Sequence, residues 1–195
     1  MNTLLYIHGF NSSELSEKAT LLAQAMHQKG LQEAAFLAPR LVWQPAKALA
    51  QLESMITEQH TQGNRVTLIG SSLGGFYGCY LAEKYQIRCI LVNPAVQAPI
   101  LLTEHLGPQY NPYTDEHYVL TQAHMAELQA MTVDKPTPSL YWLMLQEGDE
   151  TLDYRAALRA FPETARLTHE PNGSHRFEGF ERFTDEILRF ANLIV

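Results

Sequence analysis

The chain has 195 residues, of which 46% are hydrophobic and 18% charged, and a net charge of −7. This composition is typical of a soluble globular protein, and the length predicts a single domain, residues 1–195, with a sizeable core. No dense block of lysine and arginine occurs, which argues against nucleic acid or an acidic membrane surface as a partner. The chain starts without a signal-peptide pattern and has no apolar stretch long enough to cross a bilayer. We therefore expect a cytoplasmic protein whose two cysteines, which show no metal-ligand spacing, stay reduced.

Short apolar runs alternate with helical patterns along the chain. In chain order, the pattern predicts strand 3–7, helix 15–26, strand 34–39, helix 45–60, strand 65–70, helix 73–81, strand 88–94, strand 139–146, helix 153–161, strand 165–170 and helix 180–194. Asn11 and Glu14 have the spacing of a helix N-cap and its partner, so we expect the first helix to start there. That helix would carry Leu15 on its apolar face and end at Gly30.

This alternation of near-continuous apolar strands with helices predicts an α/β fold. The sheet is expected to be mostly parallel, with about six strands, and covered by helices on both faces as a three-layer sandwich. Residues 94–138, between the fourth and fifth strands, are too long for a plain connection and are predicted to be a lid insertion with a helix at 116–131. Ligands of such sheets bind at the carboxyl ends of the strands.

The segment "VTLIGSSLGG" contains two adjacent serines between a predicted strand and a predicted helix. Only Ser72 stands at the centre of a G-x-S-x-G pattern, because the positions that Ser71 would need are Ile69 and Leu73. This pattern is typical of a nucleophilic serine on a tight strand-to-helix turn, where side chains two residues away would collide. A glycine- and serine-rich turn without chemistry is the alternative, and the strand and helix around Ser72 favour the nucleophile.

A serine hydroxyl needs a base that a third group orients, and in this fold the acid and then the histidine follow the serine in the chain. His175 lies between the last strand and the last helix, where the base is required. His169 lies within the strand pattern, which favours a packing role for it. For the acid, we favour Asp149, which follows the fifth strand. Glu147, Glu150 and Asp153 stay open as alternatives, although Asp153 also has the place of a helix N-cap.

Two backbone amides can stabilise the oxyanion that forms when an acyl carbonyl is attacked. The amide of Leu73, which follows the serine, is one candidate, and the amide of Phe10, in the loop after the first strand, is the other. Arg40 and Arg176 are weaker candidates for binding an anionic part of a substrate, since most arginines stay solvated on the surface.

These residues together resemble the α/β-hydrolase superfamily. More closely, "YIHGFNSS", "GSSLGG", "VNPAV", "NPYT", "GDETLDYR" and "GSHRFEGFE" are similar to the small bacterial YqiA-type esterases, almost from end to end of the chain. The resemblance implies a three-layer α/β-hydrolase sandwich and a family nucleophile, acid and base at Ser72, Asp149 and His175. It also implies cleavage of acyl esters or of acyl thioesters such as acyl-CoA. The compact acid loop, with Gly148 directly before Asp149, leaves Asp153 as an alternative.

We therefore expect a serine esterase or thioesterase that acts on a small acyl ester or thioester, with no metal and no organic cofactor. Two other hypotheses remain open. A hydrolase-fold module without activity would bind a ligand or protein, and an acyltransferase would use the same triad to pass the acyl group to an acceptor other than water.

Overall fold

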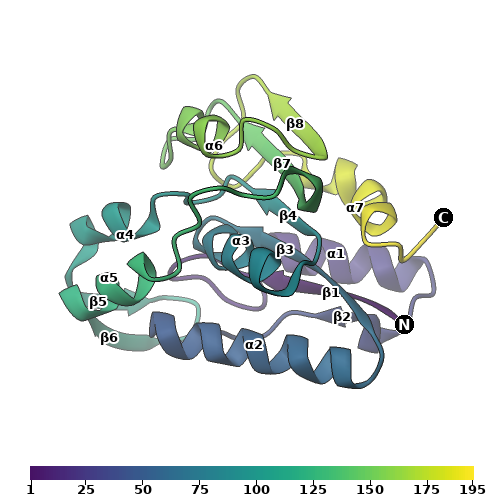
Figure 1. Cartoon of the computed structure of the whole chain (residues 1–195), viewed down its shortest axis with the longest axis horizontal. Helices are drawn as coiled ribbons and strands as arrows, with labels where there is room; N and C mark the ends of the chain where they lie inside the picture. The colour runs from purple at the N-terminus through teal and green to yellow at the C-terminus, as the bar shows by residue number, and fades with distance from the viewer.

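The centre of the molecule is a six-stranded sheet with the strand order β2-β1-β3-β4-β7-β8 (Figure 1). A computed structural model describes residues 1–195. Every neighbouring pair of strands in this sheet is parallel, which confirms the predicted α/β architecture. The strands are β1 (Asn2–Ile7), β2 (Phe36–Leu37), β3 (Arg65–Ser71), β4 (Cys89–Val92), β7 (Tyr141–Gln146) and β8 (Arg166–Glu170).

Helices cover both faces of the sheet (Figure 1). Helices α1 and α7 pack on one face, and α2, α3, α5 and α6 pack on the other. The helices are α1 (Glu17–Gln28), α2 (Pro45–Thr61), α3 (Leu73–Tyr85), α4 (Ala98–Leu101), α5 (Gln122–Gln129), α6 (Tyr154–Ala160) and α7 (Thr184–Phe190), with 3₁₀ turns at Glu33–Ala35, Leu102–His105, Pro138–Leu140 and Phe180–Phe183. None of the helices has both the length and the apolar content that a membrane crossing requires.

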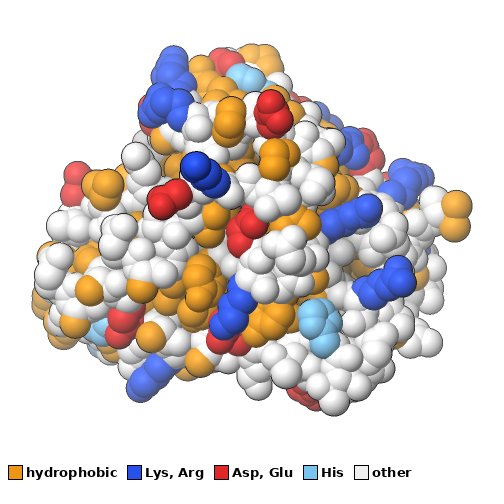
Figure 2. Space-filling view, viewed as in Figure 1, with side chains coloured by type: hydrophobic (Ala, Val, Ile, Leu, Met, Phe, Trp, Pro, Cys, Tyr) orange, Lys and Arg blue, Asp and Glu red, His pale blue; other side chains and the backbone are white.

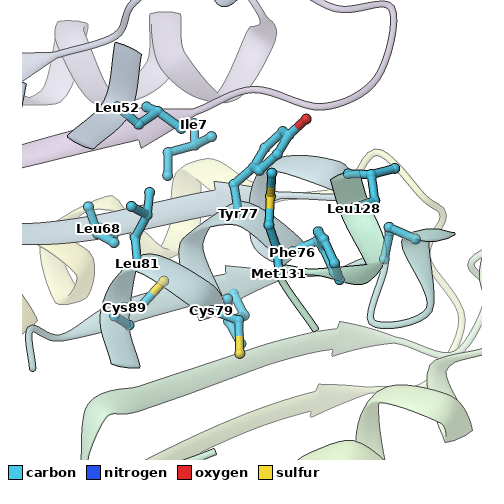
Figure 3. Close-up of a cluster of buried hydrophobic side chains, with 14 of the residues drawn as sticks. Ile7, Leu52, Leu68, Phe76, Tyr77, Cys79, Leu81, Cys89, Leu128 and Met131 are labelled. Atoms are coloured by element: carbon cyan, nitrogen blue, oxygen red, sulfur yellow. The ribbon is translucent and has the colours of Figure 1, made fainter. Parts of the chain in front are cut away.

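The strands are buried on both sides because successive side chains point to opposite faces. In β1, Leu5 and Ile7 join the core under α2 and α3, whereas Leu4 and Tyr6 join the core under α1 and α7. Figure 3 shows the first of these cores, in which Leu52 of α2 and Tyr77 of α3 lie near Ile7. The two cysteines, Cys79 and Cys89, are buried in the same core as unpaired thiols.

The first helix begins later than predicted. It starts at Glu17 with Ser16 as its N-cap, so the expected cap at Asn11 is wrong. Asn11 has a left-handed backbone (φ 47°) and its side chain accepts a hydrogen bond from Tyr118 instead. Leu15 lies before the helix and is 75% exposed. The predicted end is confirmed, since Gly30 has the left-handed φ of 67° that commonly follows a helix.

The helix predicted at 116–131, in the segment between β4 and β7, is present only in part. Residues 116–120 form a strand, β6 (Glu116–Leu120), which pairs antiparallel with β5 (Gly107–Asn111), and only Gln122–Gln129 is helical. Burial alternates along β6, with Tyr118 and Leu120 buried and their neighbours more exposed, which is the period of a strand rather than of a helix. The predicted last helix is also shorter, because its start at Phe180 is a 3₁₀ turn and α7 ends at Phe190.

Candidate active site

Ser72 lies on the tight turn between β3 and α3. Its backbone has φ 56° and ψ −121°, a conformation that costs energy in a residue with a side chain. Gly70 and Gly74, on either side of Ser72, have to be glycine because a Cβ at either position would collide with backbone atoms. A Cβ on Gly74 would lie 2.0 Å from the carbonyl oxygen of Ile7, and a Cβ on Gly70 would lie 2.2 Å from that of Gly74. The turn therefore lifts the Ser72 hydroxyl off the carboxyl end of the sheet while its neighbours pack against backbone.

The structure brings Ser72, His175 and Asp149 into one hydrogen-bonded chain. The distance from His175 Nε2 to Ser72 Oγ is 3.1 Å, and the distance from His175 Nδ1 to Asp149 Oδ2 is 2.8 Å. The carboxylate can only accept, so Nδ1 carries the proton and Nε2 is free to accept from the serine hydroxyl. Ser71 does not take part in this chain; it is buried beside the Tyr6 hydroxyl, whose pKa burial raises to about 12.

The carboxylate of Asp149 is held by its own loop. Its side chain is 2% exposed, and its other oxygen, Oδ1, accepts from the amides of Thr151 and Leu152 at 2.9 and 2.8 Å. Asp153, the alternative acid, instead accepts from the amide of Arg155 as the N-cap of α6. The geometry therefore brings Asp149 to His175 and leaves Asp153 at the helix start.

The buried side-chain amides of Asn93 and Gln146 position the loop that carries His175, and neither residue was predicted from the sequence. Asn93 Nδ2 donates to the carbonyls of Ser174 and His175, and Asn93 Oδ1 accepts from the amide of Gln146. The Gln146 side chain accepts from the amides of Ser174 and Glu178. Each of these two amide residues is 2% exposed. The signal in the sequence was a polar amide residue at the carboxyl end of an apolar strand.

The backbone amides of Phe10 and Leu73 have no acceptor in the protein. Phe10 N–H makes no hydrogen bond, and Leu73 is the first residue of α3, where no preceding turn supplies an acceptor. His8 orients the peptide that carries Phe10 N–H. Its Nε2 accepts from Leu41 N–H at 3.1 Å, so its Nδ1 carries the proton and donates to the Gly9 carbonyl at 3.0 Å. Burial lowers the pKa of His8, which favours this neutral ring.

The β5–β6 hairpin holds the loop that contains Phe10. Tyr118 donates to Asn11 Oδ1 at 2.5 Å, and Asn111 donates to the carbonyl of Ser12 at 2.9 Å. Asn11 Nδ2 also reaches Gln109 at 3.4 Å. Three contacts from residues about 100 positions away in the chain therefore fix residues 11 and 12.

A cleft of about 620 Å³ opens beside Ser72 and His175. Its rim includes the exposed side chains of Leu15 and Tyr113, and Lys18 and Arg176 line it as well. Arg40 does not reach this cleft, because its guanidinium binds the carboxylate of Glu14 through two nitrogens. Elsewhere, acidic and basic side chains are interspersed, as on the face in Figure 2, where no large patch of one sign occurs.

A model of the family described as "Uncharacterised protein family (UPF0227)" matches residues 3–192. A UPF0227 protein of Pectobacterium atrosepticum is 23% identical over 197 residues, which cover 97% of this chain and 99% of that protein. Among solved structures, the esterase domain of a Rhodothermus marinus protein has a TM-score of 0.72 at 15% identity, covering 98% of this chain and 87% of that one. The mouse α/β hydrolase domain-containing protein 10 has a TM-score of 0.69 at 16% identity, covering 99% and 90%. At these identities the likeness shows the fold, which is that of the α/β hydrolases.

Proposed function

Since the chain belongs to the UPF0227 family and has the α/β-hydrolase fold, we propose that it hydrolyses acyl esters or acyl thioesters, acyl-CoA among them, through an acyl-enzyme on Ser72. The observation that carries this proposal is the hydrogen-bonded chain from Ser72 through His175 to Asp149. The name of the structurally similar esterase domain of Rhodothermus marinus agrees with this reaction class.

In the proposed reaction, Ser72 Oγ attacks the acyl carbonyl while His175 Nε2 takes the hydroxyl proton. Asp149 keeps His175 in the required tautomer and stabilises the imidazolium that forms. The same proton then goes to the leaving alcohol or thiol, and the acyl group stays on the serine. A water then attacks the acyl carbon and gives a proton to His175. His175 passes this proton to Ser72 Oγ, so the acid is released and the serine hydroxyl is restored.

The negative charge that develops on the acyl oxygen needs donors that are already in place. Phe10 N–H and Leu73 N–H are without protein acceptors. Leu73 directly follows Ser72 in the chain, and Phe10 lines the same cleft as Ser72, which supports their role as the oxyanion site. Each such donor contributes about 3 kcal/mol to lowering the barrier. We expect short hydrogen bonds from these two amides to the acyl oxygen to form only when a substrate is bound.

The proposal is tested by p-nitrophenyl butyrate hydrolysis with the wild type, Ser72→Ala and Ser71→Ala. Loss of the nucleophile should lower kcat by about 10³-fold to 10⁶-fold. Ser71→Ala is the matched control, because it removes a neighbouring buried hydroxyl that is outside the chain to His175. Equal rates in all three proteins, or no turnover by the wild type over a broad ester panel, would refute the proposal.

Two further measurements separate the proposal from the alternatives of the sequence analysis. A fluorophosphonate probe should label the wild type and not Ser72→Ala, whereas a binding module without an activated serine would stay unlabelled. Added alcohols or thiols should yield little transacylation product if water is the normal acceptor. Predominant transfer to such an acceptor would assign the chain to the acyltransferases.

A further inference from the structure

Lys18 is a buried lysine at the edge of the cleft that contains Ser72. Its side chain comes from the second residue of α1 and is only 9% exposed, although lysine is almost never buried without a partner. The cleft is lined by Lys18 and Arg176 together with Ser72 and His175. Lys18 therefore borders the cavity that would hold the substrate.

The ammonium group of Lys18 has no carboxylate partner. Its single hydrogen bond goes from Nζ to the carbonyl oxygen of Arg176 at 2.7 Å, which uses one of its three donors. The nearest carboxylate on the same helix, that of Glu17, is directed to the Arg176 guanidinium at 3.7 Å. Burial lowers the pKa of Lys18 to about 8, so the group still carries its charge at neutral pH. A buried cation without a counterion is costly, unless a ligand supplies the negative charge.

The start of α1 adds further free donors at the same place. The N-cap residue Ser16 does not cap the helix, because its hydroxyl donates to Tyr6 instead. The amides of Glu17 and Lys18 therefore have no acceptor, and both residues line the cleft. The positive end of a 12-residue helix dipole also points here, and such helix starts bind anionic groups.

We propose that Lys18, with Arg176 and the start of α1, binds a carboxylate or phosphate group on the leaving alcohol or thiol of the substrate. This inference rests on the proposed hydrolysis at Ser72. We assign the anionic group to the leaving alcohol or thiol because His175 delivers its proton to that part of the substrate. Lys18 lies on the same side, since its Nζ donates a hydrogen bond to the carbonyl of Arg176, the residue that follows His175. The net charge of Lys18, Arg176 and Glu17 is positive, which favours an anion over a cation or a neutral group.

The test compares butyryl esters that differ only in the leaving phenol. These are the butyryl esters of 4-hydroxybenzoate, 4-hydroxyphenyl phosphate and the neutral 4-hydroxybenzamide. At pH 7 the wild type should show a kcat/KM for an anionic ester at least about tenfold above that for the neutral ester, as expected for a charge-assisted hydrogen bond. The carboxylate and phosphate esters show which anion the site prefers.

Lys18→Met should bring the ratio of anionic to neutral kcat/KM close to one. Lys29→Met is the matched control, because it removes a lysine from the other end of α1, where it pairs with Asp185, and should keep the wild-type ratio. Arg176→Gln should lower the ratio in part; its side chain is 78% exposed, so this variant supplies the test if Lys18→Met fails to fold.

The outcomes separate the two proposals. A wild-type ratio near one, or a ratio that survives Lys18→Met, would overturn the anion site and leave ester hydrolysis intact, provided that Ser72→Ala abolishes turnover of the neutral ester. If none of the esters is hydrolysed in a Ser72-dependent way, the proposed function itself fails, and the leaving-group site fails with it.

Discussion

The buried ammonium of Lys18 predicts a pH-dependent stability difference between the wild type and Lys18→Met. Burial lowers the pKa of Lys18 from 10.5 in the unfolded chain to about 8 in the folded protein. Each pKa unit corresponds to about 1.36 kcal/mol, so the charged lysine costs the folded state about 3 kcal/mol below pH 8. Methionine has a similar length and carries no charge, and it is free of this cost at every pH.

The sign of the effect follows from proton binding. Between pH 8 and 10.5 the folded wild type has lost the Lys18 proton while the unfolded chain still holds it. Because the unfolded state then binds more protons, the free energy of unfolding of the wild type rises with pH in this range. From pH 7 to pH 10 the wild type should gain about 2.5 kcal/mol relative to Lys18→Met.

Urea unfolding at pH 7, 8, 9 and 10, in buffers without phosphate, measures this difference. The lost hydrogen bond to the Arg176 carbonyl changes the offset between the two proteins, but it changes the slope with pH much less. Lys29→Met controls for the general effect of removing one cation. A difference between wild type and Lys18→Met that stays constant from pH 7 to pH 10 would refute the reasoning, since the ammonium would then not be desolvated.

Three further predictions, the first with a control variant, test the site and the residues that support it. Asp149→Asn should lower kcat by about 10⁴-fold, because the amide favours the wrong tautomer of the histidine, whereas Asp153→Asn, which keeps the cap of α6, should stay within a few-fold; similar losses in both would contradict the choice of acid. Tyr118→Phe removes the hydrogen bond to Asn11 and should lower kcat several-fold and the free energy of unfolding by about 1 kcal/mol; an unchanged kcat would separate the hairpin from catalysis. Gly74→Ala should destabilise by at least about 2 kcal/mol in urea unfolding, because its Cβ meets backbone rather than a flexible side chain; a stable, active variant would argue against the tight turn.

The sheet could be predicted because it depends on local signals, and the structure brings together the predicted Ser72, His175 and Asp149. Apolar runs such as residues 141–146 are buried on both faces and read as strands without reference to any other part of the chain. The glycines around Ser72 form a local pattern that indicates a tight turn, although Gly74 is also required by its contact with the distant Ile7 carbonyl. The fold class is confirmed by the parallel sheet and by the similar solved structures.

The features that were missed depend on contacts between distant segments. Asn11 looked like a helix cap because its local spacing fits one, but its side chain bonds to a hairpin about 100 residues away. Residues 116–120 looked helical because the pairing strand at 107–111, which contains a proline and a glycine, is weak by propensity. Lys18 was not among the site residues predicted from the sequence. A signal was present, since Lys18 precedes the buried Leu22 and Met26 by four and eight residues and so shares their face.

The hydrogen bonds from the β5–β6 hairpin to residues 11 and 12 limit how this region can be redesigned. An insertion between two strands is a natural place to exchange segments between relatives in order to change substrate preference. Here the exchanged piece would also have to supply a hydroxyl for Asn11 and an amide for Ser12, the groups that Tyr118 and Asn111 provide. A graft chosen only for the shape of its pocket would therefore loosen Phe10 as well, and a loss of turnover in such a chimaera would report on the loop rather than on the fit of the substrate.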